Sequence, residues 1–482
     1  MNYLLAFTSL AVAVTVYIAA SVCTRKVSFR AIPGPPSPSW IFGNMLQLWT
    51  SSPYGKYEFA WLKQYGNVYR LKGCFGQNWL MVSDSRAVQH VLNNVDTFRN
   101  SPLLERAIYA LDGPKSVLYV QELFENVARK ISSKLEASSE SVVDVCQFIG
   151  PGTLAAIAEV VLGRSVEELD EELIHLLSTV IAEETRPSPS SVIANALSTL
   201  FPRLNLSVLP AFGLLRKARK LATRLGTQVI EEKAAALDGG MDPGNDLYAY
   251  LLRQNTTLTK EDIACQTCIL LVAGQDTTAN TLTFGLLELA RKPELQEKIR
   301  KEIHSMSTSS YDNKPLLNAL IKESLRMYPA EALVERVAVR DTVIPLTESI
   351  TTMAGEHVDH ILVRNGELVI IGVASYQRDK FRWGENPDKF DPLRWVDGRV
   401  KQGDAIGPYA NLLSFLGGPR TCLGWRFAVM EMQTIFSELL GNFSFALAED
   451  KPDNLFAQLA VTLQPCDLNG QKVVPLRVTR LL

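Results

Sequence analysis

Residues 415–424 read FLGGPRTCLG, and this stretch decides how the rest of the chain is interpreted. A single cysteine, Cys422, lies in a glycine-rich loop and is followed by WRFAVMEM (425–432), whose apolar spacing predicts an amphipathic helix. A cysteine at the start of a helix feels the positive end of the helix dipole, which favours the thiolate. Because they lack a Cβ atom, Gly417, Gly418 and Gly424 would let a large flat ligand approach the backbone. The loop therefore predicts a ligand-binding thiolate, with a buried structural cysteine as the alternative.

The pattern Phe-x-x-Gly-x-Arg-x-Cys-x-Gly in this loop resembles the haem-binding loop of the cytochrome P450 superfamily. The resemblance implies a mainly α-helical protein with the P450 fold, a large helical domain with small β-sheets. It also implies haem b as the cofactor, held by an axial cysteine thiolate that favours cleavage of the O–O bond. The implied haem-binding residues are Cys422 as the iron ligand, Arg420 and Arg336 beside the haem carboxylates, and Phe415, Gly418 and Gly424 around the ring.

A second motif lies upstream, where LLNALIKESLRMYP (316–329) predicts a helix that ends at proline. Glu323 and Arg326 are three residues apart and share a face of this helix, although an isolated pair of this kind is usually a solvated surface ion pair. In the resembled family the pair is buried and joined by an arginine from a Phe-x-Pro-x-Arg segment, present here as FDPLRW (390–395). The resemblance implies that Glu323, Arg326 and Arg394 hold the cysteine loop and take no part in the chemistry.

A third motif interrupts a long apolar segment. Residues 261–290 contain no proline and follow a plausible helix cap at 259–262, so a long buried helix is predicted. Its middle reads AGQDTTAN (273–280), in which a threonine can bond the carbonyl four residues back and Gly274 permits a ligand to come close. A polar patch against another helix is the alternative. The cluster resembles the Ala-Gly-x-Asp-Thr-Thr motif of the same family, which implies that Asp276 and Thr277 support proton delivery to dioxygen.

Composition and the N-terminal segment set the expected organisation. The chain has 482 residues, 47% hydrophobic, and a net charge of −2, which suits a large core and gives no reason to propose nucleic acid. Residues 3–23 carry no charge and precede Arg25 and Lys26, so a membrane-spanning helix with the remainder on the cytosolic side is expected. A cleaved signal peptide is the alternative. The expected parts are an anchor (1–24), a basic and proline-rich hinge (25–40) and one catalytic domain (41–482).

Two patches of β-sheet are also expected. Residues 68–71 (VYRL) and 79–82 (WLMV) are typical of strands. Further along, Asn365-Gly366 predicts a hairpin turn that joins strands at 361–363 and 367–371.

The chain departs from the family pattern at residues 113–121. Family members usually carry an aromatic-x-x-x-Arg helix after the first sheet, and its side chains meet a haem carboxylate. Here LDGPKSVLYV (111–120) runs almost directly into the helix-like QELFE (121–125), so loss of a helix is expected. This loss weakens the expectation of full haem retention and electron supply.

The resemblance implies a haem-thiolate monooxygenase that inserts one atom of dioxygen into a lipophilic small molecule. Electrons would come from NADPH through a separate flavoprotein reductase. An anchor followed by a proline hinge resembles the microsomal members of the family, which implies a single-pass protein of the endoplasmic reticulum membrane in a eukaryote, with a fungus and secondary metabolism favoured. The alternatives are a reductase-independent peroxide isomerase or dehydratase of the same fold, and a non-catalytic haem-binding relative.

Overall fold

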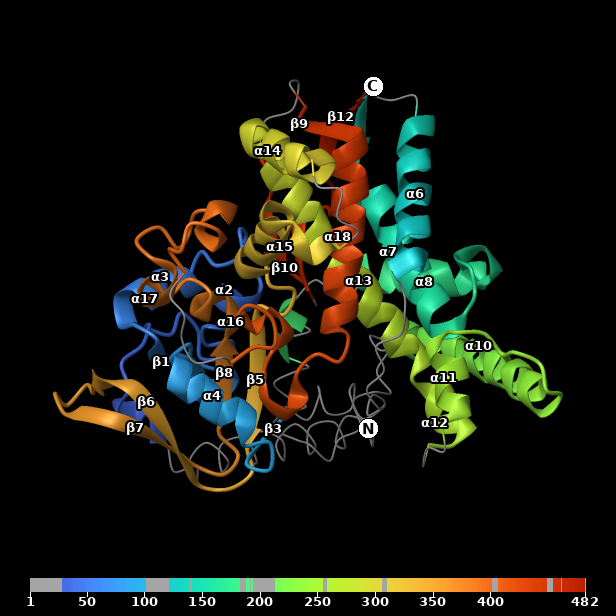
Figure 1. Ribbon diagram of the computed structural model, residues 1–482. Helices are drawn as coiled ribbons and strands as arrows, with labels where there is room; N and C mark the ends of the chain where they lie inside the picture. The colour runs from blue at the N-terminus through green and yellow to red at the C-terminus, as the bar shows by residue number, and fades with distance from the viewer. Residues whose placement is uncertain are drawn as a thin grey trace, which may run out of the picture.

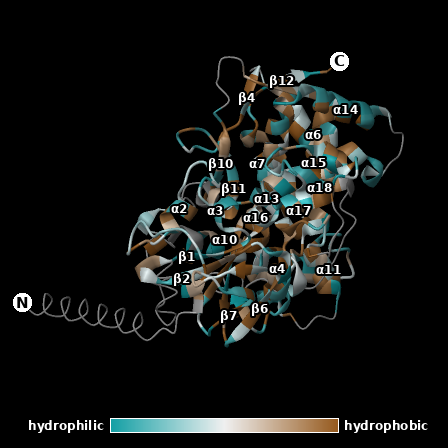
Figure 2. Ribbon diagram, turned by 90° about the vertical axis from the view of Figure 1, so that its left-hand side faces the viewer, coloured by the Kyte–Doolittle hydropathy of each residue, from teal (hydrophilic) through white to brown (hydrophobic). Residues whose placement is uncertain are grey.

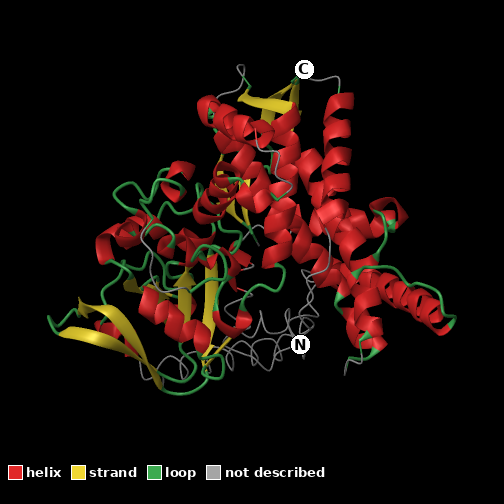
Figure 3. Cartoon of the chain, in the orientation of Figure 1, coloured by secondary structure: helices red, strands yellow, loops and turns green. Residues whose placement is uncertain are grey.

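The computed structural model describes residues 28–100, 121–138, 141–182, 188–190, 192–193, 213–254, 258–305, 310–400, 406–448, 454–460 and 462–481. These residues form a mainly helical protein in which the strands gather into small separate groups (Figures 1 and 3). No helix in the described part of the chain is both long enough and apolar enough to cross a membrane. The expected anchor at 1–24 and the shortened segment at 113–120 lie outside the described residues.

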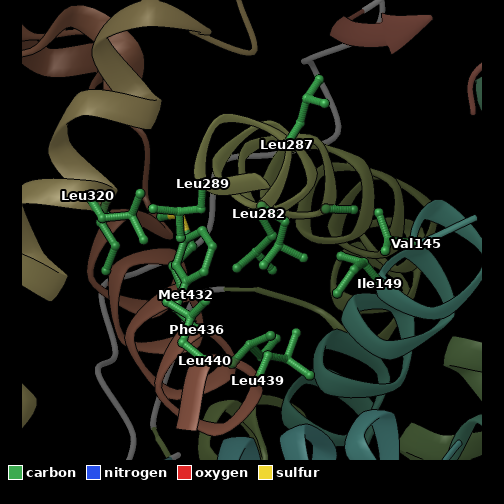
Figure 4. Close-up of a cluster of buried hydrophobic side chains, with 14 of the residues drawn as sticks. Val145, Ile149, Leu282, Leu287, Leu289, Leu320, Met432, Phe436, Leu439 and Leu440 are labelled. Atoms are coloured by element: carbon green, nitrogen blue, oxygen red, sulfur yellow. The ribbon is translucent and has the colours of Figure 1, made fainter. Parts of the chain in front are cut away.

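A long central helix, α13 (Thr267–Ala290), organises the helical part of the fold. Its side chains are apolar around most of its circumference, as expected of a helix buried on all sides. It packs against α7 (Cys146–Leu162), α15 (Pro315–Met327) and α18 (Trp425–Asn442). Figure 4 shows part of the shared core, with labelled side chains from these helices and from the residue before α7: Val145, Ile149, Leu282, Leu287, Leu289, Leu320, Met432, Phe436, Leu439 and Leu440.

The predicted helix over 261–290 is divided at Gln266 into α12 (Lys260–Cys265) and α13. The predicted cap is present, because the Thr259 hydroxyl accepts a hydrogen bond from the Asp262 amide and the Asp262 carboxylate accepts one from the Thr259 amide. In Figure 2 the outer helix α14 (Pro293–Ser305) carries mostly hydrophilic residues, and its buried residues are Gln296 and Ile299.

The remaining α-helices surround this core: α2 (Met45–Trp49), α3 (Glu58–Tyr65), α4 (Ser85–Asn93), α6 (Gln121–Ala137), α8 (Glu171–Ala182), α10 (Gly213–Asp238), α11 (Leu247–Arg253), α16 (Val373–Tyr376) and α17 (Lys380–Trp383).

The largest sheet has the strand order β1-β2-β8-β5-β3. Its strands are β1 (Val68–Lys72), β2 (Asn78–Val82), β8 (Leu368–Gly372), β5 (Leu333–Ala338) and β3 (Phe98–Asn100). β2 and β8 run parallel, with Leu80 opposite Val369, and the other neighbours are antiparallel. The strands expected at 68–71 and 79–82 are therefore confirmed.

The smaller sheets flank the helices. β6 (Thr342–Thr351) and β7 (His357–Val363) form a hairpin that projects from the body of the molecule (Figure 3). β10 (Phe456–Leu459) pairs with β11 (Leu463–Cys466), and β12 (Pro475–Arg480) lies between β4 (Val142–Asp144) and β9 (Phe443–Leu447).

The predicted hairpin at Asn365-Gly366 is wrong. A turn is present, because Gly366 has φ +84° and the Glu367 amide donates to the Arg364 carbonyl at 3.0 Å. The strands on either side of it do not pair, since β7 pairs with β6 whereas β8 lies between β2 and β5. The physical reason is burial. All five residues of β8 are buried, which suits a central strand covered on both faces, while β7 is mostly exposed.

Candidate active site

The cysteine loop lies between the 3₁₀ turn Leu413–Phe415 and the start of α18 at Trp425. The Cys422 amide donates to the Phe415 carbonyl at 2.9 Å and closes the loop, while the Phe415 ring is buried against Tyr409. The Cys422 side chain is accessible, yet protein surrounds it closely enough that burial raises the pKa of the thiol. The Gly424 amide acts in the opposite direction. Burial therefore outweighs the effect of the Gly424 amide, whereas coordination to a metal cation would favour the thiolate.

Gly418 and Gly424, both in the cysteine loop, have different surroundings. Gly418 has φ +68°, and a Cβ atom there would lie 2.7 Å from Asn93 Oδ1 and 2.8 Å from the Leu92 carbonyl oxygen at the end of α4. Its backbone conformation and this contact are themselves sufficient to require glycine, whether or not a ligand also comes close. Gly424 differs, because a Cβ atom there would meet nothing within 4 Å. A role for either glycine in haem binding stays a prediction.

Gly274 in the central helix likewise serves helix packing. A Cβ atom at this position would lie 2.5 Å from the Ile157 side chain of α7. The glycine therefore lets α7 and α13 come together, and the predicted approach of a ligand does not explain it.

Two arginines meet near the cysteine loop. Arg336 on β5 is buried and donates to the Glu335 carbonyl at 2.8 Å, and Arg420 donates to the Phe98 carbonyl of β3 at 2.9 Å. Burial and, second, the nearby charge of Arg420 lower the pKa of Arg336 to about 10. Among the residues that the structure describes, neither guanidinium forms an ion pair with a carboxylate. Two neighbouring cations, one of them in the loop of Cys422, form together with that cysteine a donor set that fits haem, which offers iron to the sulfur and carboxylates to the arginines.

The predicted ion-pair triad is confirmed and fully internal. Glu323 and Arg326 are joined by contacts of 2.8 and 2.9 Å, and Arg394 Nε donates to Glu323 Oε1 at 3.0 Å. The same carboxylate accepts from the Trp395 indole at 2.9 Å and from the Asp391 amide at 2.7 Å. Because the side chains of Glu323 and Arg326 have no exposed surface, this arrangement fixes geometry around one carboxylate.

Gln377 connects the triad helix to the cysteine loop, and sequence reasoning missed it. Its side-chain amide donates to the carbonyls of Leu325 and Arg326 at 3.1 and 2.9 Å. Its oxygen accepts from the Leu413 amide at 2.9 Å and the Ser414 hydroxyl at 3.1 Å. The residue is fully buried, and every contact bridges segments that are far apart in sequence. No local pattern marks such a residue.

Thr277 and Asp276 are neighbours in sequence, but their side chains have different partners. The Thr277 hydroxyl donates to the Ala273 carbonyl at 2.8 Å, as the sequence predicted. Ala273 is exposed and Thr277 half-buried, so this face of α13, here called the open face, borders accessible space. The Asp276 carboxylate is buried and points to β11 and the loop after it.

Three donors hold the Asp276 carboxylate. Lys472 Nζ contacts Oδ1 at 2.6 Å, Asn280 Nδ2 donates to Oδ2 at 3.2 Å, and the Thr462 hydroxyl donates to Oδ2. Asn280 Nδ2 also donates to Thr462 Oγ1 at 3.0 Å. Lys472 and Thr462 were missed by sequence reasoning, because they lie 196 and 186 residues from Asp276 along the chain.

Two further acids lie near the helices of the site. Glu431 on α18 is fully buried, and neither carboxylate oxygen has a hydrogen-bond partner among the described residues. Burial raises its pKa well above the ordinary range, and the nearby Thr278 hydroxyl offsets only part of this effect. Glu331, in the turn between α15 and β5, is accessible although protein encloses it, and burial raises its pKa to about 7 despite the nearby charge of Arg336. Burial therefore shifts both acids towards the neutral form.

Comparison with known proteins agrees with this arrangement. A family model described as cytochrome P450 matches residues 105–468. Cytochrome P450 monooxygenase 205 of Postia placenta is 28% identical, over 91% of this chain and 90% of that protein. Cytochrome P450 monooxygenase 81 of the same fungus is 27% identical, over 92% of this chain and 91% of that protein. Cytochrome P450 monooxygenase claP of the fungus Ampulloclitocybe clavipes is 26% identical, over 87% of each chain.

Proposed function

The chain belongs to the cytochrome P450 family of haem-thiolate monooxygenases, and from this premise we propose that Cys422 is the iron ligand and that Arg336 and Arg420 hold the haem carboxylates. The observation that carries this assignment is the position of two neighbouring guanidinium groups at the loop of Cys422, neither of which forms an ion pair with a carboxylate in the described part of the chain. When bound, haem supplies the oxygen-activating chemistry, and the thiolate favours cleavage of the O–O bond.

Thr277 and Asp276 are proposed to handle protons. Thr277 lies on the open face of α13, where its Oγ1 can hold a proton and pass it towards the reacting oxygen. Asp276, one residue earlier, would resupply that proton from the side of α13 that faces β11. The Thr277→Ala variant should consume NADPH but release hydrogen peroxide in place of product, whereas Thr277→Ser should remain coupled. Unchanged product yield per NADPH in Thr277→Ala would refute this role.

The electron donor is proposed to be a separate NADPH-dependent flavoprotein reductase, and the substrate a lipophilic small molecule that enters beside the open face. The intact Asp276-Thr277 pair supports a monooxygenase over a peroxide isomerase, which needs no proton delivery to dioxygen. Product formed only with NADPH and reductase would support this assignment. Rearrangement or dehydration of an organic hydroperoxide without reductase, with no oxygen atom transferred to a second molecule, would support the isomerase instead.

The uncharged segment at residues 3–23 supports a further proposal, a single N-terminal membrane anchor that holds the catalytic domain on the cytosolic face of the endoplasmic reticulum. Carbonate extraction of membranes from expressing cells tests this, because an anchored chain stays with the pellet. A variant that begins at the proline-rich segment 32–38 should move to the supernatant.

A carbon-monoxide difference spectrum tests the assignment of Cys422. The reduced wild-type protein should give the red-shifted Soret band characteristic of thiolate-ligated haem. The Cys422→Ser variant should lose this band, whereas Cys265→Ser, a half-buried cysteine of α12, should keep it. A red-shifted band in Cys422→Ser would refute the assignment.

A further inference from the structure

The proposed proton role of Asp276 does not by itself explain why so many hydrogen-bond donors surround its carboxylate. Both carboxylate oxygens are occupied by donors from outside the Thr277 side chain: Lys472 at Oδ1, and Asn280 and Thr462 at Oδ2. The side chain of Asp276 is only 7% exposed and that of Lys472 is 20% exposed. An acid held in this way is turned away from the alcohol that it would serve.

Lys472 comes from a part of the C-terminal segment whose backbone is hydrogen-bonded on both sides. Lys472 follows a tight turn in which the Asp467 amide donates to the Gln471 carbonyl at 3.0 Å and the Gln471 amide donates to Asp467 Oδ1 at 2.8 Å. Two residues later, the Val474 amide donates to Asp144 Oδ1 at 2.9 Å. Because the backbone is fixed on both sides of Lys472, the position of its ammonium group is defined by the fold.

The charges explain why removal of the Lys472 cation should have a measurable effect on Asp276. A buried carboxylate that loses its cation remains as an uncompensated charge, which is strongly unfavourable. Asn280 and Thr462 can donate hydrogen bonds but carry no charge, so Lys472 is the cation in contact with Asp276 among the described residues. Since the Lys472 side chain is partly exposed, it also connects the buried acid to solvent.

We infer that Lys472 is a positioning residue for Asp276: from the loop after β11 it holds the carboxylate turned away from Thr277, and sets when that acid can serve the alcohol. This inference rests on the proposed proton role of Asp276. It assigns to the C-terminal segment a part in oxygen activation that no motif in the sequence indicates. In this inference Lys472 acts through its contact with the Asp276 carboxylate.

The test compares Lys472→Met and Lys472→Arg with a matched control, Lys233→Met. Lys233 forms an ion pair of the same length, 2.6 Å, with the buried Asp246 between α10 and α11, so its loss removes a similar contact elsewhere. Product yield per NADPH and the solvent deuterium isotope effect on turnover are measured for each variant. Lys472→Met should lower the yield and change the isotope effect several-fold, Lys472→Arg should restore both, and Lys233→Met should leave both as in the wild type.

A second readout does not depend on turnover. Thermal unfolding midpoints of Lys472→Met, Asp276→Asn and the double variant test the pairing itself, because contacting charges are not additive. The double variant should unfold at a midpoint no lower than Lys472→Met alone. Additive midpoints, or a Lys472→Met variant that stays as coupled as Lys233→Met, would overturn the inference. Loss of the red-shifted carbon-monoxide band in the wild type would instead refute the proposed function.

Discussion

The Glu323→Gln substitution is expected to destabilise the fold and to loosen the cysteine loop. The side chain keeps its shape but loses the charge that compensates two buried guanidinium groups, Arg326 and Arg394. Five donors reach the Glu323 carboxylate, at distances between 2.7 and 3.0 Å. A glutamine has only one acceptor oxygen for them, and its amide group would face N–H donors.

The magnitude follows from the burial of the pair. Breaking a fully buried ion pair by removing one partner reduces the free energy of unfolding by about 3–5 kcal/mol. An unfolding entropy of about 2 cal/mol/K per residue, summed over a chain of this length, is about 1 kcal/mol/K. The midpoint of thermal unfolding should therefore fall by about 3–5 °C.

Differential scanning calorimetry of the haem-loaded protein measures this shift, and the haem-to-protein absorbance ratio reports on the loop. The control is Glu168→Gln, because Glu168 pairs with Arg164 on the surface at 3.0 Å and an exposed pair contributes less than about 1 kcal/mol. Equal midpoints for Glu323→Gln and Glu168→Gln would refute the reasoning. If Glu323→Gln is destabilised but retains its full haem content, the expected loosening of the cysteine loop is refuted.

Four further predictions concern other residues of the site and its surroundings. Because burial raises the pKa of Glu431, the stability of the wild type should fall as pH rises above the ordinary glutamate range. The Glu431→Gln variant should be more stable than the wild type at pH 7, and its stability should not fall with pH in this way. An equal fall of stability with pH in both proteins would contradict the prediction. The pKa of Glu331 is raised from 4.5 to about 7, so the contribution of this residue to stability is complete below pH 4.5 and lost by about pH 7. The difference in unfolding midpoint between the wild type and Glu331→Gln should therefore change only between these pH values. Gln377→Ala should lower haem retention measured by transfer to apomyoglobin, without moving the Soret band; unchanged transfer would argue against its bridging role. Gly418→Ala should reduce haem content through strain and the contact with α4, whereas Gly424→Ala, which meets no protein atom, should fold normally.

The sequence predicted those parts of the site in which one helix or loop sets the geometry. Thr277 bonds the carbonyl four residues back because helix periodicity alone places the two groups together. Glu323 and Arg326 share a helix face for the same reason. The cysteine loop has the expected order, in which a turn precedes the helix at Trp425.

The parts that could not be predicted depend on contacts between distant segments. Lys472 reaches Asp276 across 196 residues, and nothing near Lys472 in the sequence marks it as a partner. Gln377 is a single polar residue without a motif. The hairpin prediction at 365–366 was wrong because a turn signal is local, whereas the choice of strand partner depends on which strand is buried on both faces. The meeting of Arg336 and Arg420 likewise requires β3 to lie beside β5.

The two arginines beside the cysteine loop also bear on how the protein matures in the cell. β3 and β5 hold the two arginines close together, and their like charges repel each other until an anionic ligand binds. Binding of that ligand therefore stabilises the fold around the two arginines. A group that binds only the folded chain stabilises it in proportion to its supply. Newly made chains in haem-poor cells would therefore spend longer incompletely folded and be removed sooner by proteolysis, which makes haem supply a determinant of the amount of enzyme as well as of its activity.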